Sequence, residues 1–226
     1  MKKHIVCFGD SNTHGLCADP SDCADGGRRF NEEERWTQLL QKALGEEYLI
    51  IEEGLPGRTT VFSDPLHEGM SALDVAYPIL MTHEPVDLLI VMLGTNDTKE
   101  RFSVGAPGIA LGMDRLISKI KSVPCWTGKG PNILMISPAH IGEGMHASAV
   151  AGTMGQGCAK RSAELSRYLE PVAKAQGCAF WDAEGNTEIN EVDYMHLTKK
   201  GHSMLAKKLA QIVPALCADP AAEPKT

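Results

Sequence analysis

Five short apolar runs recur along the chain, and segments with a helical repeat of apolar positions separate them. The runs cover 5–8, 48–51, 86–93, 133–136 and 178–181. Continuous apolar runs of this length are typical of strands buried on both faces, as in a parallel sheet. Between them, helical spacing predicts helices over 36–44, 71–83, 109–120 and 159–175, and a last helix with Thr198 as its N-cap.

This alternation predicts a three-layer α/β/α fold with a five-stranded parallel sheet. Right-handed crossovers favour a doubly wound, flavodoxin-like strand order. We expect one domain over 1–216, followed by a disordered Ala/Pro/Glu/Lys-rich tail at 217–226. Two long segments are predicted to be loops. The segment 15–34 is expected to be a surface loop with a functional role, and 138–157 a loop near a cleft or at a subunit contact.

Composition and charge narrow the class of protein. The chain of 226 residues is 43% hydrophobic and 23% charged, as expected of a globular protein. A chain of this length needs no disulfide or structural metal to stabilise its fold. Its formal net charge of −7 argues against nucleic acid or an anionic membrane as partner. Seven cysteines without a C-x-x-C pair favour reduced thiols and a cytoplasmic location. Without a G-x-G-x-x-G or Walker motif, we expect no nucleotide and no other cofactor.

Residues that could take part in catalysis follow four of the predicted strands. Ser11 comes after the first strand, Gly57 after the second, Asn96 after the third, and the pair Asp193 and His196 after the fifth. In an open parallel sheet, ligands bind outside the carboxyl ends of the strands. We therefore expect these residues to meet at one edge of the sheet.

Together these residue types fit acyl transfer. A serine hydroxyl needs an adjacent base, and His196 suits that role for Ser11 because imidazole titrates near neutral pH. Asp193, three residues earlier, would orient the imidazole and stabilise its protonated form. The backbone N–H groups of Ser11 and Gly57 and the side-chain amide of Asn96 would form an oxyanion hole.

The motifs that carry these residues resemble the four signature blocks of the SGNH, or GDSL-type, hydrolase family. The blocks are Gly9-Asp10-Ser11-Asn12, Gly57, Gly94-Thr95-Asn96-Asp97 and Asp193-x-x-His196, in that order. The resemblance implies that the serine is the nucleophile, that the glycine and asparagine are oxyanion donors, and that the histidine is the base.

Longer strings are similar to the bacterial aryl esterase branch of this family: Glu52-Glu53-Gly54-Leu55, Arg58-Thr59-Thr60 and Met92 to Lys99. This similarity implies hydrolysis of small acyl esters, acyl transfer to alcohols or peroxide in some members, and assembly as homo-oligomers. Two positions depart from the pattern. Asn12 stands where the family's nickname has leucine, and His14 where tryptophan is expected, so both are assigned to the substrate pocket.

The carboxylates Asp10 and Asp97 have two interpretations. They could form a paired-carboxylate site, but we favour a role as hydrogen-bonding residues that stiffen the loops carrying Ser11 and Asn96. Asp182, just after the fifth strand, could replace Asp193 as the orienting acid, although it lies far from the histidine in sequence.

Histidines outside the motifs have a less specific interpretation. His140 and His146 could line the cleft, yet solvated or hydrogen-bonded histidines are commoner. The Asp193/His196 pair could begin a metal site, but no third ligand stands in a recognisable pattern, so no metal is expected.

The sequence thus predicts a serine esterase that hydrolyses short-chain, in particular acetyl, esters through an acyl-serine intermediate, with acyl transfer to alcohols as a further possibility. A deacetylase of acetylated sugars is an alternative with the same chemistry. A non-catalytic scaffold or binding subunit is the alternative of another class. The expected partners are a small ester substrate and further copies of the chain.

Overall fold

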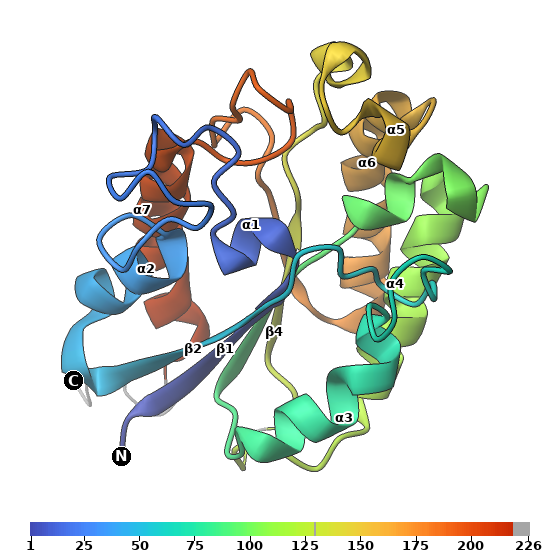
Figure 1. The fold of residues 1–226 in the computed structure, drawn as a ribbon. Coiled ribbons are helices and arrows are strands. Elements are labelled where there is room, and N and C mark those ends of the chain that lie inside the picture. The colour runs from blue at the N-terminus through green and yellow to red at the C-terminus, as the bar shows by residue number, and fades with distance from the viewer. Residues whose placement is uncertain (129, 219–226) are drawn as a thin grey trace.

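A parallel five-stranded sheet forms the centre of the computed structural model, which describes residues 1–128 and 130–218 (Figure 1). Its strand order is β2-β1-β3-β4-β5, and every pairing is parallel. This is the predicted flavodoxin-like order, in which the chain reverses its winding direction beside β1. The strands are β1 (Lys3–Gly9), β2 (Tyr48–Gly54), β3 (Leu88–Met92), β4 (Ile133–Ser137) and β5 (Ala179–Asp182).

Helices cover both faces of the sheet (Figure 1). One face carries α2 and α7, and the other carries α3, α4 and α6. The helices are α1 (Ser11–His14), α2 (Trp36–Leu44), α3 (Ala72–Thr82), α4 (Ala106–Lys121), α5 (Ala151–Met154), α6 (Cys158–Gln176) and α7 (Lys199–Leu216). The predicted three-layer architecture is therefore confirmed.

Successive side chains of β1 point to opposite faces of the sheet and so contribute to two separate hydrophobic cores. Val6 and Phe8 pack with α3, α4 and α6, whereas Ile5 and Cys7 pack with α2 and α7. Successive side chains of a strand point to opposite faces, so a strand covered on both sides must be apolar throughout. This explains why the strands appear in the sequence as continuous apolar runs.

Short helical turns occur where the sequence predicted only loops. The segment 138–157 contains a 3₁₀ helix at Glu143–Ala147 and then α5. Both are about one turn long, which is too short to give a periodic signal. At the other end of the chain, Cys217 is buried at the end of α7, and residues 219–226 of the expected disordered tail lie outside the described residues.

The short helix α1 lies against the ends of β1 and β2. A Cβ atom on Gly54 would come within 2.2 Å of the backbone nitrogen of His14. The last residue of β2 must therefore be glycine for α1 to sit where it does. This close approach fixes the position of Ser11, the first residue of α1.

Candidate active site

Ser11 stands at the carboxyl end of β1, beside the point where the winding of the sheet reverses. Asp10 is the N-cap of α1, and its Oδ1 accepts a hydrogen bond of 3.0 Å from the backbone N–H of Asn12. The N–H of Ser11 is the first amide of the helix and has no acceptor within it. Ser11 is only 5% exposed, so its hydroxyl lies at the bottom of a depression.

His196 and Asp193 lie in the tight turn that precedes α7. Asn190 organises this turn, because its Oδ1 accepts hydrogen bonds from the backbone N–H groups of Val192 and Asp193. Tyr194 adopts the left-handed conformation (φ 60°), which folds the chain back so that residues 193 and 196 face each other.

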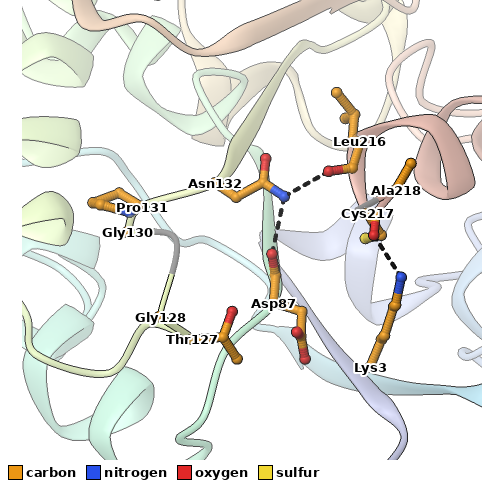
Figure 2. Close-up of a pocket in the computed structure, with 10 residues that line it drawn as sticks. All are labelled: Lys3, Asp87, Thr127, Gly128, Gly130, Pro131, Asn132, Leu216, Cys217 and Ala218. Carbon is orange, nitrogen blue, oxygen red and sulfur yellow. Dashed lines mark hydrogen bonds between the residues drawn. The ribbon is translucent and has the colours of Figure 1, made fainter. Parts of the chain in front are cut away.

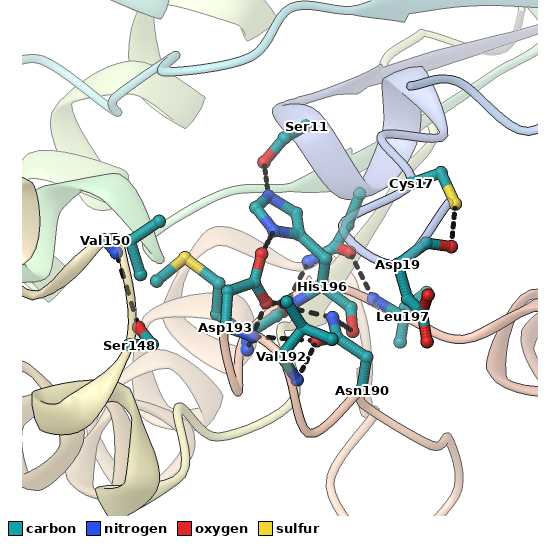
Figure 3. A network of polar contacts seen from close by, with 12 residues as sticks. Ser11, Cys17, Asp19, Ser148, Val150, Asn190, Val192, Asp193, His196 and Leu197 are labelled. Carbon is teal, nitrogen blue, oxygen red and sulfur yellow. Dashed lines mark hydrogen bonds and ion pairs between the residues drawn. The ribbon is translucent and has the colours of Figure 1, made fainter. Parts of the chain in front are cut away.

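A continuous line of hydrogen bonds joins Asp193, His196 and Ser11 (Figure 3). Oδ2 of Asp193 lies 2.5 Å from Nδ1 of His196, and Nε2 of His196 lies 2.8 Å from Oγ of Ser11. The structure thus brings together three residues that the sequence placed at the ends of two separate strands. The histidine is positioned to take the proton of the serine hydroxyl, with the aspartate behind it.

The environment of Asp193 keeps it ionised. Burial alone would raise its pKa, but the hydrogen bond and charge of His196, together with a bond from Asn190, lower that pKa to about 2. Its Oδ1 also accepts the N–H groups of Met195 and His196, both at 3.1 Å. An anion held in this way favours the tautomer of His196 with the proton on Nδ1.

The expected oxyanion donors border the same cavity as Ser11. Asn96 begins a 3₁₀ turn (Asn96–Thr98) just past β3, and its Nδ2 is buried without a hydrogen-bond partner among the described residues. Gly57 has φ 92°, a left-handed conformation that favours glycine. A buried amide with an unused donor is what a developing oxyanion requires.

The Asn96 amide provides a direct test of the oxyanion hole. Replacing Asn96 with alanine should lower kcat by about 100- to 1000-fold, because one donor to the tetrahedral intermediate is lost. The melting temperature should not fall, since the amide nitrogen has no partner among the described residues that the variant would leave unpaired. Steady-state kinetics with a nitrophenyl ester measure the effect. An unchanged kcat would remove Asn96 from this role.

Asn12 and His14, which the sequence assigned to the substrate pocket, are not among the residues that line this cavity. The Asn12 side chain instead connects α1 to the histidine loop: its Nδ2 donates to the carbonyl of Met195 and its Oδ1 accepts the N–H of Leu197. His14 lies over β2, where its backbone nitrogen approaches Gly54. Through these two bonds, Asn12 holds the residues on either side of His196 against α1.

Asp10 and Asp97 are the buried carboxylates of the two flanking loops. Oδ1 of Asp97 accepts hydrogen bonds from the backbone N–H and the hydroxyl of Thr60, at 2.9 and 2.5 Å. These bonds connect the Asn96 turn to the loop that carries Gly57. Burial raises the pKa of each carboxyl to about 6, although hydrogen bonds lower it in part. Their hydrogen bonds fit the predicted role of stiffening the loops.

The raised pKa of Asp97 predicts a pH-dependent cost to stability. Its folded pKa of about 6 exceeds the unfolded value, so folding favours the protonated form. The resulting stabilisation is present below about pH 4 and is lost as the pH rises through 6. In Asp97→Asn, the amide oxygen can still accept the hydrogen bonds of Thr60, but the side chain carries no charge. The unfolding free energy of Asp97→Asn relative to wild type should therefore rise by about 2 kcal/mol between pH 4 and pH 7.

Urea unfolding at several pH values measures this difference. Asp74→Asn is the matched control, because Asp74 is exposed on α3 and its replacement removes one carboxylate without changing a buried group. A pH-independent difference for Asp97→Asn would show that Asp97 does not titrate in this range.

A cavity of about 250 Å³ opens in front of Ser11. Most of its wall is apolar, and three methionines contribute to it. The lining consists of Ser11, Leu16, Pro56, Gly57, His67, Met70, Asn96, Lys99, Val150, Thr153, Met154, Met195 and His196. Sequence reasoning missed most of this wall. For Lys99 a signal existed, because it lies three residues beyond Asn96, whereas the members from 150–154 belong to a segment without a period.

The remaining candidates from the sequence lie elsewhere. His140 and His146 are near Glu184 and Glu143, each with a ring nitrogen 3.6 Å from a carboxylate oxygen, and neither lines the cavity. The Asp182 carboxylate accepts the N–H of Glu184. It is therefore Asp193 whose carboxylate bonds to His196.

A second cavity, of about 540 Å³, lies at the amino-terminal edge of the sheet (Figure 2). The side-chain amide of Asn132 on its wall donates to the carbonyls of Asp87 and Leu216, and Lys3 donates to the carbonyl of Cys217. These hydrogen bonds join the beginnings of β1, β3 and β4 to the end of α7. The catalytic candidates line the opposite edge of the sheet.

A serine, histidine and aspartate in line at the carboxyl edge of a doubly wound sheet define the class of this protein as a serine hydrolase. The model of the GDSL-like lipase/acylhydrolase family matches residues 7–204. The chain belongs to this family, and it is a carboxylic ester hydrolase.

Solved structures from the family are similar over nearly the whole chain. An aryl esterase from M. smegmatis is 33% identical, with a TM-score of 0.84 over 95% of this chain and 99% of its own. A carbohydrate acetylesterase family member from Sinorhizobium meliloti is 32% identical, with the same TM-score and coverage. No curated protein matches the sequence. Within the described residues, none of the helices has the length and apolar character needed to span a bilayer.

Proposed function

We propose that this protein hydrolyses short-chain, in particular acetyl, esters through an acyl-Ser11 intermediate. The observation that supports this most strongly is the line of hydrogen bonds from Asp193 through His196 to Ser11, at 2.5 and 2.8 Å. A base within 3 Å of the hydroxyl and an orienting carboxylate behind it are what serine activation requires.

In the first step, Oγ of Ser11 attacks the ester carbonyl while Nε2 of His196 takes its proton. The carbonyl oxygen becomes negative and receives hydrogen bonds from Asn96 Nδ2 and the N–H groups of Ser11 and Gly57. His196 then gives the proton to the departing alcohol, which leaves the acyl group on Ser11. Water, activated by the same imidazole, releases the acid and restores the serine. An alcohol in place of water would give acyl transfer.

The size of the cavity supports a short acyl group. A volume of about 250 Å³ must hold the acyl group and part of the alcohol, and apolar side chains such as Met70 and Met154 form much of its wall. A long lipid chain would not fit in this space. A small ester therefore suits the site better.

Deacetylation of acetylated sugars is a second candidate with the same chemistry. The similarity to the carbohydrate acetylesterase family member from Sinorhizobium meliloti favours this candidate. The similarity to the M. smegmatis aryl esterase favours activity on aryl esters. Turnover of aryl acetates, acetylated xylose and acetylated glucosamine should be compared at matched concentrations. Higher kcat/KM for the sugars would identify the deacetylase.

Labelling by a fluorophosphonate tests whether the protein is an acyl-transfer enzyme or a scaffold. The probe reacts with activated serines, so the wild-type protein should be labelled and Ser11→Ala should not. Asn96→Ala keeps the Ser11 hydroxyl and the His196 base, so this variant should still be labelled, but at a lower rate than wild type. Absence of labelling in a folded wild-type sample would contradict the proposal and favour a non-catalytic scaffold.

A further inference from the structure

Lys99 is one of the residues that line the substrate cavity, and it carries a buried ammonium group. It lies three residues beyond Asn96, and its side chain is only 4% exposed. Lysine is seldom buried to this extent, because removing an ammonium from water costs free energy unless other groups compensate. Burial also lowers the pKa of Lys99, an effect that the carboxylate of Asp64 opposes.

The hydrogen bonds of Lys99 leave part of its capacity unused. An ammonium has three N–H donors. Within residues 1–128 and 130–218, its one hydrogen-bond acceptor is Oδ2 of Asp64, at the rather long distance of 3.3 Å. The same oxygen lies 3.6 Å from Nε of Arg101, so two cations share it. Lys99 can therefore donate to a further acceptor from the cavity.

The position of Lys99 in the cavity points to the acyl part of the ester. The departing alcohol must lie against His196, which protonates it. Lys99 is bound instead to Asp64, in the segment 56–70 that also brings Gly57 and Met70 to the wall. On the proposed mechanism the acyl group points away from His196, so it is the part of the substrate that would face this segment.

We propose that Lys99 determines specificity for the acyl group, by donating a hydrogen bond to a carboxylate or other oxygen acceptor at the end of a short acyl chain. This inference rests on the proposed esterase function. Because the rest of the wall is mostly apolar, this ammonium would distinguish acyl chains that end in an oxygen acceptor from purely aliphatic ones.

Two esters of similar length test the inference: 4-nitrophenyl butyrate and mono(4-nitrophenyl) succinate, whose acyl chain ends in a carboxylate. Rates measured with Ser11→Ala are subtracted to remove spontaneous hydrolysis. The ratio of kcat/KM for succinate over butyrate should fall by about 10- to 100-fold in Lys99→Met, the effect of losing a hydrogen bond between charged groups. Lys99→Arg, which keeps the charge, should retain more of the ratio than Lys99→Met.

Lys160→Met is the matched control, because Lys160 is exposed on α6 and its loss changes the net charge equally. Lys99→Gln replaces Lys99→Met if the latter does not fold. An unchanged ratio in the Lys99 variants, or an equal fall for both esters, would overturn the inference. In those cases butyrate hydrolysis by the wild type would leave the esterase function standing. A wild type that hydrolyses 4-nitrophenyl acetate but not the succinate would overturn the inference alone, and one that hydrolyses none of the three esters would contradict the esterase function itself.

Discussion

Replacing His196 with alanine should lower kcat for 4-nitrophenyl acetate by about 10⁶-fold, the loss found when the base of a serine hydrolase is removed. The imidazole lies 2.8 Å from Oγ of Ser11 and takes part in both halves of the reaction, first accepting a proton and then donating it. Without it, the hydroxyl is a weak nucleophile and the alcohol leaves without a proton. Substrate binding should change little, because the apolar residues of the cavity wall remain.

Steady-state kinetics, with melting temperature as the measure of folding, test this expectation. His140→Ala is the matched control, since His140 is near Glu184 and does not line the cavity. Added imidazole should restore part of the activity of His196→Ala, because the variant leaves space for it beside Ser11. Retention of kcat within tenfold of wild type would show that another group is the base.

Replacing Asp193 with alanine should have the next largest effect, lowering kcat by about 10⁴-fold while leaving measurable turnover. The carboxylate bonds to Nδ1 of His196 at 2.5 Å and favours the tautomer that can accept the proton of Ser11. It also stabilises the imidazolium that forms. His196 itself remains in the variant, which is why some activity should persist.

Asp193 has a second role that the experiment must separate from the first. Its Oδ1 accepts hydrogen bonds from Asn190 and from two backbone N–H groups of the turn. Asp193→Asn keeps an oxygen acceptor for these bonds and should still lose most of the activity. Asp182→Ala, which removes the competing acid, should act like wild type. A large loss for Asp182→Ala with a small loss for Asp193→Ala would reverse the assignment.

Much of the fold could be predicted because it depends on short-range patterns. Every described strand overlaps one of the predicted apolar runs, since a strand segment covered by helices on both faces has no polar side. The helix predicted over 71–83 contains Pro78, and α3 continues through this residue. The one-turn helices between 143 and 154 were missed, because their residues are placed by packing against other segments rather than by their own periodicity.

For the active site, the sequence by itself determined which residues could do the chemistry and at which edge of the sheet they would meet. Ser11, Asn96 and His196 each follow a strand, and parallel strands end at a common edge. Tertiary structure decided what surrounds them. Asn12, assigned to the pocket, instead bonds to Met195 and Leu197, whereas Lys99 lines the cavity. A polar side chain takes its role from partners far away in sequence, and only the packed fold selects them.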